Sequence, residues 1–79
     1  MANTSEKVET ELVGRGIFSN GNELRVFRGL TEYLYCVINS FGIVLDTGYT
    51  EIRDEDVYDP LSYVLYWCQP AEVYGSYTI

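Results

Sequence analysis

The chain has 79 residues, of which 47% are hydrophobic and 22% are charged, and this size and composition are typical of one globular domain. Twelve acids against five bases give a net charge of -7, which disfavours direct binding to nucleic acid or to an anionic membrane. The chain has no histidine, so it lacks the commonest general base and the commonest zinc ligand.

Residues 1–7 are polar and predict a flexible amino-terminal tail, followed by a single α+β domain over residues 8–79. Residues 8–18 are rich in β-branched and apolar residues and predict the first strand, in which Gly14 and Gly16 indicate a bend or bulge. Residues 19–22 predict a turn.

Residues 23–41 can be interpreted in two ways. Apolar residues spaced three and four apart predict an amphipathic helix: Leu24, Phe27, Leu30, Leu34, Val37, Ile38 and Phe41. Against the helix, Asn20-Gly21 is also typical of a hairpin turn, and residues 33–38 have a high strand propensity. We predict the helix and keep two strands as the alternative.

The second half of the chain predicts a hairpin, a helix and a strand. Residues 43–45 and 49–52 flank Asp46-Thr47-Gly48, a sequence typical of a short loop. Asp59-Pro60 predicts a helix start with Asp59 as the N-cap, Pro70 predicts the helix end, and residues 73–79 predict the last strand. This order predicts a ferredoxin-like βαββαβ fold with two helices on one face of an antiparallel sheet. The alternative is a mostly β sheet with one C-terminal helix.

The cysteines and the amino terminus indicate the compartment. Cys36 and Cys68 lie among apolar residues, which predicts two buried, reduced thiols. The amino terminus lacks the apolar segment of a signal peptide, and no apolar run approaches the roughly 20 residues of a membrane span. We therefore expect a cytoplasmic protein.

One short motif is similar to a catalytic sequence, but it is too short to indicate an enzyme. Residues Ile43-Val44-Leu45-Asp46-Thr47-Gly48 resemble the catalytic turn of retroviral-type aspartic proteases, in which two chains each donate one aspartate. The resemblance ends after these residues, and Tyr49 stands where that family usually has a small residue. Asp, Thr and Gly are also ordinary turn residues, and no serine or cysteine has a histidine partner. We expect no enzyme activity.

Asp54, Glu55, Asp56 and Asp59 offer the oxygen ligands that magnesium and calcium prefer. An EF-hand loop starting at Asp54 would need a glycine at position 59 and a glutamate at position 65, but the chain has Asp59 and Leu65 there. We expect a solvated segment leading into the helix, and no metal and no cofactor.

Acidic residues concentrate between Asp46 and Asp59, where six acids accompany the single base Arg53. Carboxylates this close together approximate the spacing of nucleic-acid phosphates, and tyrosines provide rigid contact area at interfaces. We therefore predict that this segment binds a positively charged partner. The predicted partner-binding residues are Asp46, Tyr49, Glu51, Asp54, Glu55, Asp56, Tyr58 and Asp59.

In size, acidity and tyrosine content, the chain is similar to the small acidic inhibitors of phages and mobile elements, such as anti-CRISPR and anti-restriction proteins. This likeness implies a non-enzymatic inhibitor that occupies a basic nucleic-acid-binding surface of a larger protein or ribonucleoprotein by nucleic-acid mimicry, in the host cytoplasm. The alternative is a structural or assembly module that self-associates through a strand edge and tyrosines, including Tyr74 and Tyr77. We expect a monomer or a homodimer.

Overall fold

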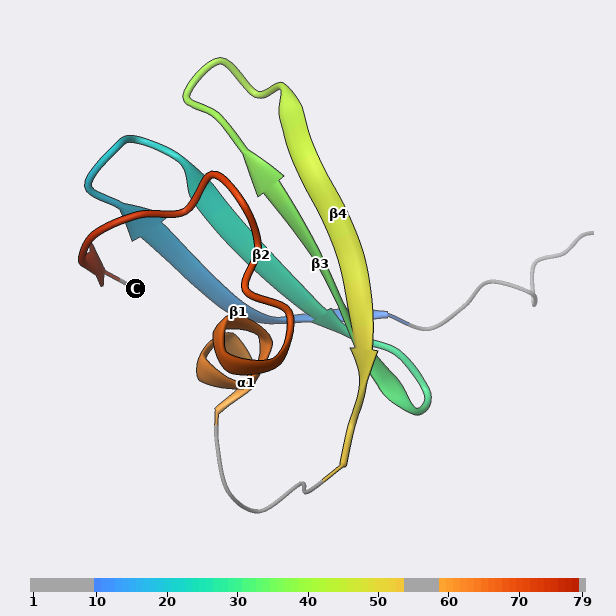
Figure 1. Cartoon of the computed structure of the whole chain (residues 1–79). Coiled ribbons are helices and arrows are strands. Elements are labelled where there is room, and N and C mark those ends of the chain that lie inside the picture. Colours follow the sequence, from blue (N-terminus) through green and yellow to red (C-terminus); the bar gives the residue numbers. More distant parts are fainter. Residues whose placement is uncertain (1–9, 54–58, 79) are drawn as a thin grey trace, which may run out of the picture.

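The computed structural model describes residues 10–53 and 59–78, which form an antiparallel sheet with one short helix packed on it (Figure 1). The elements are β1 (Glu11–Phe18), β2 (Glu23–Arg28), β3 (Glu32–Ile38), β4 (Val44–Glu51), α1 (Pro60–Trp67) and β5 (Tyr77–Thr78). The strand order is β4-β3-β2-β1-β5, so four strands follow one another as a meander and the two-residue β5 pairs with the outer edge of β1. This mostly β arrangement with one helix replaces the predicted ferredoxin-like fold, and it is the alternative left open above.

The predicted helix over residues 23–41 is wrong, because this segment forms β2 and β3. Its apolar residues lie on both faces of the sheet: Leu24 and Val26 are buried beneath α1, whereas Phe27 points to the opposite face. Apolar residues on both faces of a strand hide the alternation of period two that identifies a strand. Gly29 lies in the turn between the strands, where its N–H donates to the Glu32 carbonyl oxygen.

The predicted bulge in the first strand is confirmed, since the register of β1 against β2 shifts between Leu12 and Gly14. Gly14 and Gly16 face the helix, and a Cβ on Gly16 would lie 3.0 Å from Leu61. The missing side chains therefore let α1 approach β1 closely.

The predicted hairpin around Asp46-Thr47-Gly48 is also wrong, because these residues lie inside the continuous strand β4. All three have partners on β3, and Gly48 lies opposite Tyr35. A Cβ on Gly48 would lie 2.7 Å from the Tyr35 ring, so the glycine makes room for a side chain instead of forming a turn.

The predicted helix start is confirmed. Asp59 is the N-cap and Pro60 the first helical residue of α1, and the Asp59 carboxylate accepts a hydrogen bond from the Ser62 N–H at 2.8 Å. Tyr63 and Val64 of this helix are buried against the sheet. Of the predicted last strand over residues 73–79, only β5 is extended and paired among the described residues.

The two faces of the sheet differ. Figure 1 shows α1 and the chain that follows it on one face, which we call the helix face; in the described part of the chain no helix packs on the other, which we call the open face. The strand register aligns Leu12, Phe27, Leu34 and Tyr49 in one apolar row across the open face. This sheet therefore has apolar side chains on both sides.

The two cysteines lie on different faces. Cys36 pairs with Arg25 on the open face, and Cys68 follows α1 on the helix face. Both are free thiols in the structure and half-buried, so they are less buried than predicted. Neither α1 nor any other part of the described chain has the length and apolarity of a membrane-crossing helix.

Candidate functional site

The structure separates the predicted partner-binding residues. Asp46 and Tyr49 both belong to β4, but they point to opposite faces because side chains alternate along a strand. Asp46 is half-buried, and its Oδ2 accepts hydrogen bonds from the Ala71 N–H at 3.3 Å and from the Tyr35 hydroxyl at 3.4 Å. Asp46 therefore links β4 to the chain after α1, while Tyr49 stands on the open face and is 68% exposed.

Glu51 and Asp59 also differ in their surroundings. Glu51 is exposed at the end of β4, two residues from Tyr49 and on the same face. Asp59 is committed to capping α1, because its second carboxylate oxygen accepts from the Ser62 hydroxyl at 3.2 Å. The other predicted residues, Asp54, Glu55, Asp56 and Tyr58, lie outside the described residues. Of the described ones, only Tyr49 and Glu51 share a surface.

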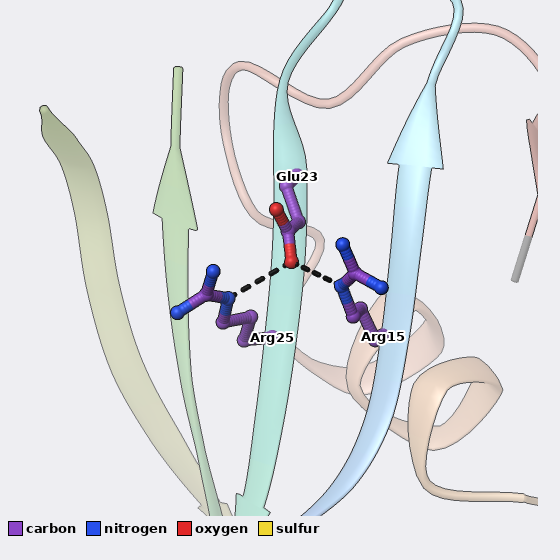
Figure 2. Close-up of polar contacts among 3 residues, drawn as sticks. All are labelled: Arg15, Glu23 and Arg25. Carbon is purple, nitrogen blue, oxygen red and sulfur yellow. Dashed lines mark hydrogen bonds and ion pairs between the residues drawn. The ribbon is translucent and has the colours of Figure 1, made fainter. Parts of the chain in front are cut away.

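Two of the four described arginines share one acid. Figure 2 shows Glu23 between Arg15 and Arg25, with one carboxylate oxygen 2.5 Å from Nε of Arg15 and 2.8 Å from Nε of Arg25. The hydrogen bond from Arg25, followed by that from Arg15, lowers the pKa of Glu23 below its ordinary value. Glu23 in turn raises the pKa of Arg25.

The other two described arginines contact aromatic rings. The guanidinium carbon of Arg28 lies 5.9 Å from the centre of the Tyr33 ring, and that of Arg53 lies 4.3 Å from the centre of the Trp67 ring. Glu23 is thus the one acid within residues 10–53 and 59–78 that takes part in an ion pair. The described acids outside ion pairs are Glu11, Glu32, Asp46, Glu51, Asp59 and Glu72.

Two of these acids face each other. Glu32 of β3 lies directly opposite Glu51 of β4. The neighbouring pair is hydrogen-bonded, since the Ile52 N–H donates to the Thr31 carbonyl oxygen at 3.1 Å. Because bonded and non-bonded pairs alternate in an antiparallel ladder, Glu32 and Glu51 form a non-bonded pair, in which side chains come closest. Like charges in this position destabilise the sheet and attract a cation.

An open hollow of about 530 Å³ lies between β4 and the end of α1. Its lining includes Tyr35, Gly48, Thr50, Arg53, Trp67 and Cys68. The Arg53 guanidinium, stacked on Trp67, also donates to the Thr50 hydroxyl at 3.0 Å, which fixes one wall.

Two titratable side chains of the hollow, Cys68 and Tyr35, have raised pKa values. Burial raises the pKa of the Cys68 thiol, and burial followed by the charge of Asp46 raises the pKa of Tyr35. Both groups are therefore protonated at neutral pH, and a protonated thiol is a weak nucleophile. Nowhere in the described part of the chain do three or more potential metal ligands gather.

Sequence reasoning missed the hollow. Arg53 appeared only as the lone base among acids, and Trp67 as part of a helix, since nothing in the local sequence shows that both lie beside β4. Comparison of the chain with protein-family models, with curated proteins and with solved structures finds no match.

Proposed function

We propose that the protein is a small non-enzymatic inhibitor that occupies a basic, nucleic-acid-binding surface of a larger protein or complex, of the kind that phages and mobile elements carry. The observation that carries this proposal is the imbalance of the ion pairs. Among the described residues, Glu23 engages two of four arginines, and six acids remain outside any ion pair. The net charge of -7 therefore produces a field that attracts a cationic partner and accelerates association with it.

Two of the acids predicted to bind the partner are used within the domain itself. Asp46 and Asp59 are already engaged in hydrogen bonds within the domain. The described part of the proposed binding surface is therefore the region of the open face around the last residues of β4. There Tyr49 provides an exposed aromatic contact, and the Glu32–Glu51 pair provides concentrated negative charge.

The test captures a binding protein from the native host with the intact chain and then measures the purified pair. We expect the affinity to fall at least about tenfold between about 50 and 500 mM salt, and DNA or RNA bound by the partner to displace the chain. The double variant Glu32→Gln/Glu51→Gln should associate more slowly than Glu11→Gln/Glu72→Gln, which removes the same charge elsewhere. An affinity independent of salt, or a ternary complex with nucleic acid, would overturn the proposal.

Self-association is the second candidate, because the outer edge of β4 has no strand partner among the described residues. The two tyrosines predicted for it differ. Tyr77 is half-buried, with its ring 5.2 Å from that of Phe18, whereas Tyr74 is 59% exposed. Sedimentation of the pure protein separates the candidates: a stable dimer that Tyr74→Ser dissociates supports self-association, and a monomer at all concentrations excludes it.

A further inference from the structure

The outer edge of β4 has no strand partner in the described part of the chain. The Thr31–Ile52 pair is hydrogen-bonded, so the alternation along the ladder directs the N–H groups of Thr47, Tyr49 and Glu51 away from β3, together with the C=O groups of Thr47 and Tyr49. The Glu51 C=O is engaged within the domain, because it accepts a hydrogen bond from the Tyr63 hydroxyl at 3.1 Å. No strand of the described chain lies on that side. The three N–H groups and the C=O groups of Thr47 and Tyr49 can therefore pair with an added strand.

We propose that the edge of β4 binds an extended segment of a basic partner protein as an additional strand, with a lysine or arginine of that segment beside Glu51. The inference rests on the proposed function, since it specifies where and how the partner is recognised. Backbone hydrogen bonds to an exposed edge supply affinity in such complexes, and alternating side chains supply specificity.

The part of the edge around Tyr49 and Glu51 lacks the features that usually prevent strand addition. The irregular part of β4, where the register against β3 shifts between Val44 and Asp46, lies at the other end of the strand. β4 has eight residues and contains no proline, lysine or arginine. The same strand also has three exposed apolar residues, Val44, Leu45 and Tyr49. At the opposite edge, by contrast, β1 is partly covered by β5.

The residues around β4 indicate which side chains the added strand would have at each position. On the helix face, a side chain opposite Gly48 or Thr50 enters the hollow beside Trp67, which accommodates a bulky apolar group. On the open face, a side chain opposite Tyr49 extends the apolar row, and one opposite Glu51 meets the two opposed carboxylates. A cation there relieves their repulsion.

Charge also decides between a foreign segment and a second copy of this chain. Two copies would each bring a charge of -7 to the shared edge, and β4 carries no base to set beside Glu51. A basic segment instead complements both the local pair and the net charge.

The experiment uses two acetylated and amidated octapeptides of alternating valine and threonine, one with two lysines and one with two glutamates at the same positions. We expect the lysine peptide to bind the intact protein at least about tenfold more tightly than the glutamate peptide, and Glu51→Lys to reverse this preference. Binding should protect the amides of Thr47, Tyr49 and Glu51 from hydrogen exchange. Peptide binding without protection of these amides, or formation of a dimer that excludes the peptide, would overturn the inference.

Thr47→Pro provides a second test, because proline removes an outward N–H while the bonds to β3 remain. Thr47→Val, which keeps this N–H, is the matched control. We expect the proline variant to bind the lysine peptide at least about tenfold more weakly than the valine variant, with equal circular dichroism spectra for the two. Equal binding by the two variants would refute strand addition.

The two proposals fail in different ways. If Thr47→Pro still binds a captured basic partner that nucleic acid displaces, strand addition is wrong and the inhibitor function stands. If the lysine peptide protects the three amides but nucleic acid fails to displace the captured partner, nucleic-acid mimicry is wrong and strand addition stands.

Discussion

Replacing Glu23 with glutamine tests whether the ion pairs of Glu23 with Arg15 and Arg25 stabilise the domain. The substitution removes the carboxylate that both arginines share and leaves Arg15 directly opposite Arg25. Their Nε atoms are at most about 5.3 Å apart, the sum of 2.5 and 2.8 Å, and two unit charges at that distance repel by about 0.8 kcal/mol in water. Both arginine side chains are about half exposed, so solvent limits the effect. We expect Glu23→Gln to lower the free energy of unfolding by about 1 kcal/mol at neutral pH.

The pH dependence of this loss identifies its cause. The folded protein holds the pKa of Glu23 below the ordinary 4.5, so its stabilisation is complete above the unfolded pKa and is lost as the pH falls through the lower folded pKa. Urea unfolding from pH 7 down to about pH 3 should show the wild type approaching the variant at acidic pH. Glu72→Gln, an exposed acid in no ion pair among the described residues, is the control. A difference between wild type and Glu23→Gln that does not change with pH would refute an electrostatic role.

Three further substitutions test the core, the helix cap and the opposed acids. Leu61→Ala should lower the free energy of unfolding, measured with urea, by about 2–5 kcal/mol, because Leu61 is 2% exposed and fills the space over the β1 glycines. This loss is a large part of the total free energy of unfolding, about 4–12 kcal/mol, expected for a domain of this size. Asp59→Ala should cost about 1 kcal/mol in thermal unfolding, and Asp59→Asn less, because asparagine retains a capping oxygen. Glu51→Gln should raise the free energy of unfolding by about 0.5 kcal/mol at low salt by relieving repulsion with Glu32, and less at high salt; a loss of stability would show that the two carboxylates do not repel.

The features that the sequence predicted correctly depend on residues that are close together in the sequence. The cap at Asp59-Pro60 and the bulge beside Gly14 follow from local backbone preferences, and both are present. The helix over residues 23–41 failed because apolar residues of β2 and β3 serve two faces of the sheet. Their combined spacing imitates a helical period, although Leu24 and Phe27 point in opposite directions.

The candidate site was less predictable for a related reason. The density of acids between Asp46 and Asp59 predicts one charged surface, but the alternation of β4 sends Asp46 to the helix face and Glu51 to the open face. The opposition of Glu32 and Glu51 depends on the register of β3 against β4, and the hollow depends on where α1 ends. Both are tertiary features that a single sequence does not specify.

Places where a fold departs from its own local rules are informative, because such departures persist at functional sites. Three of them meet at the end of β4. Like charges oppose each other at Glu32 and Glu51, an eight-residue edge strand has no protecting proline or lysine, and Tyr49 ends an apolar row in solvent. Each of these features costs the isolated domain stability or solubility, and one bound strand with a basic residue would remove all three costs together. This convergence favours the β4 edge over the whole acidic segment as the place where a partner binds.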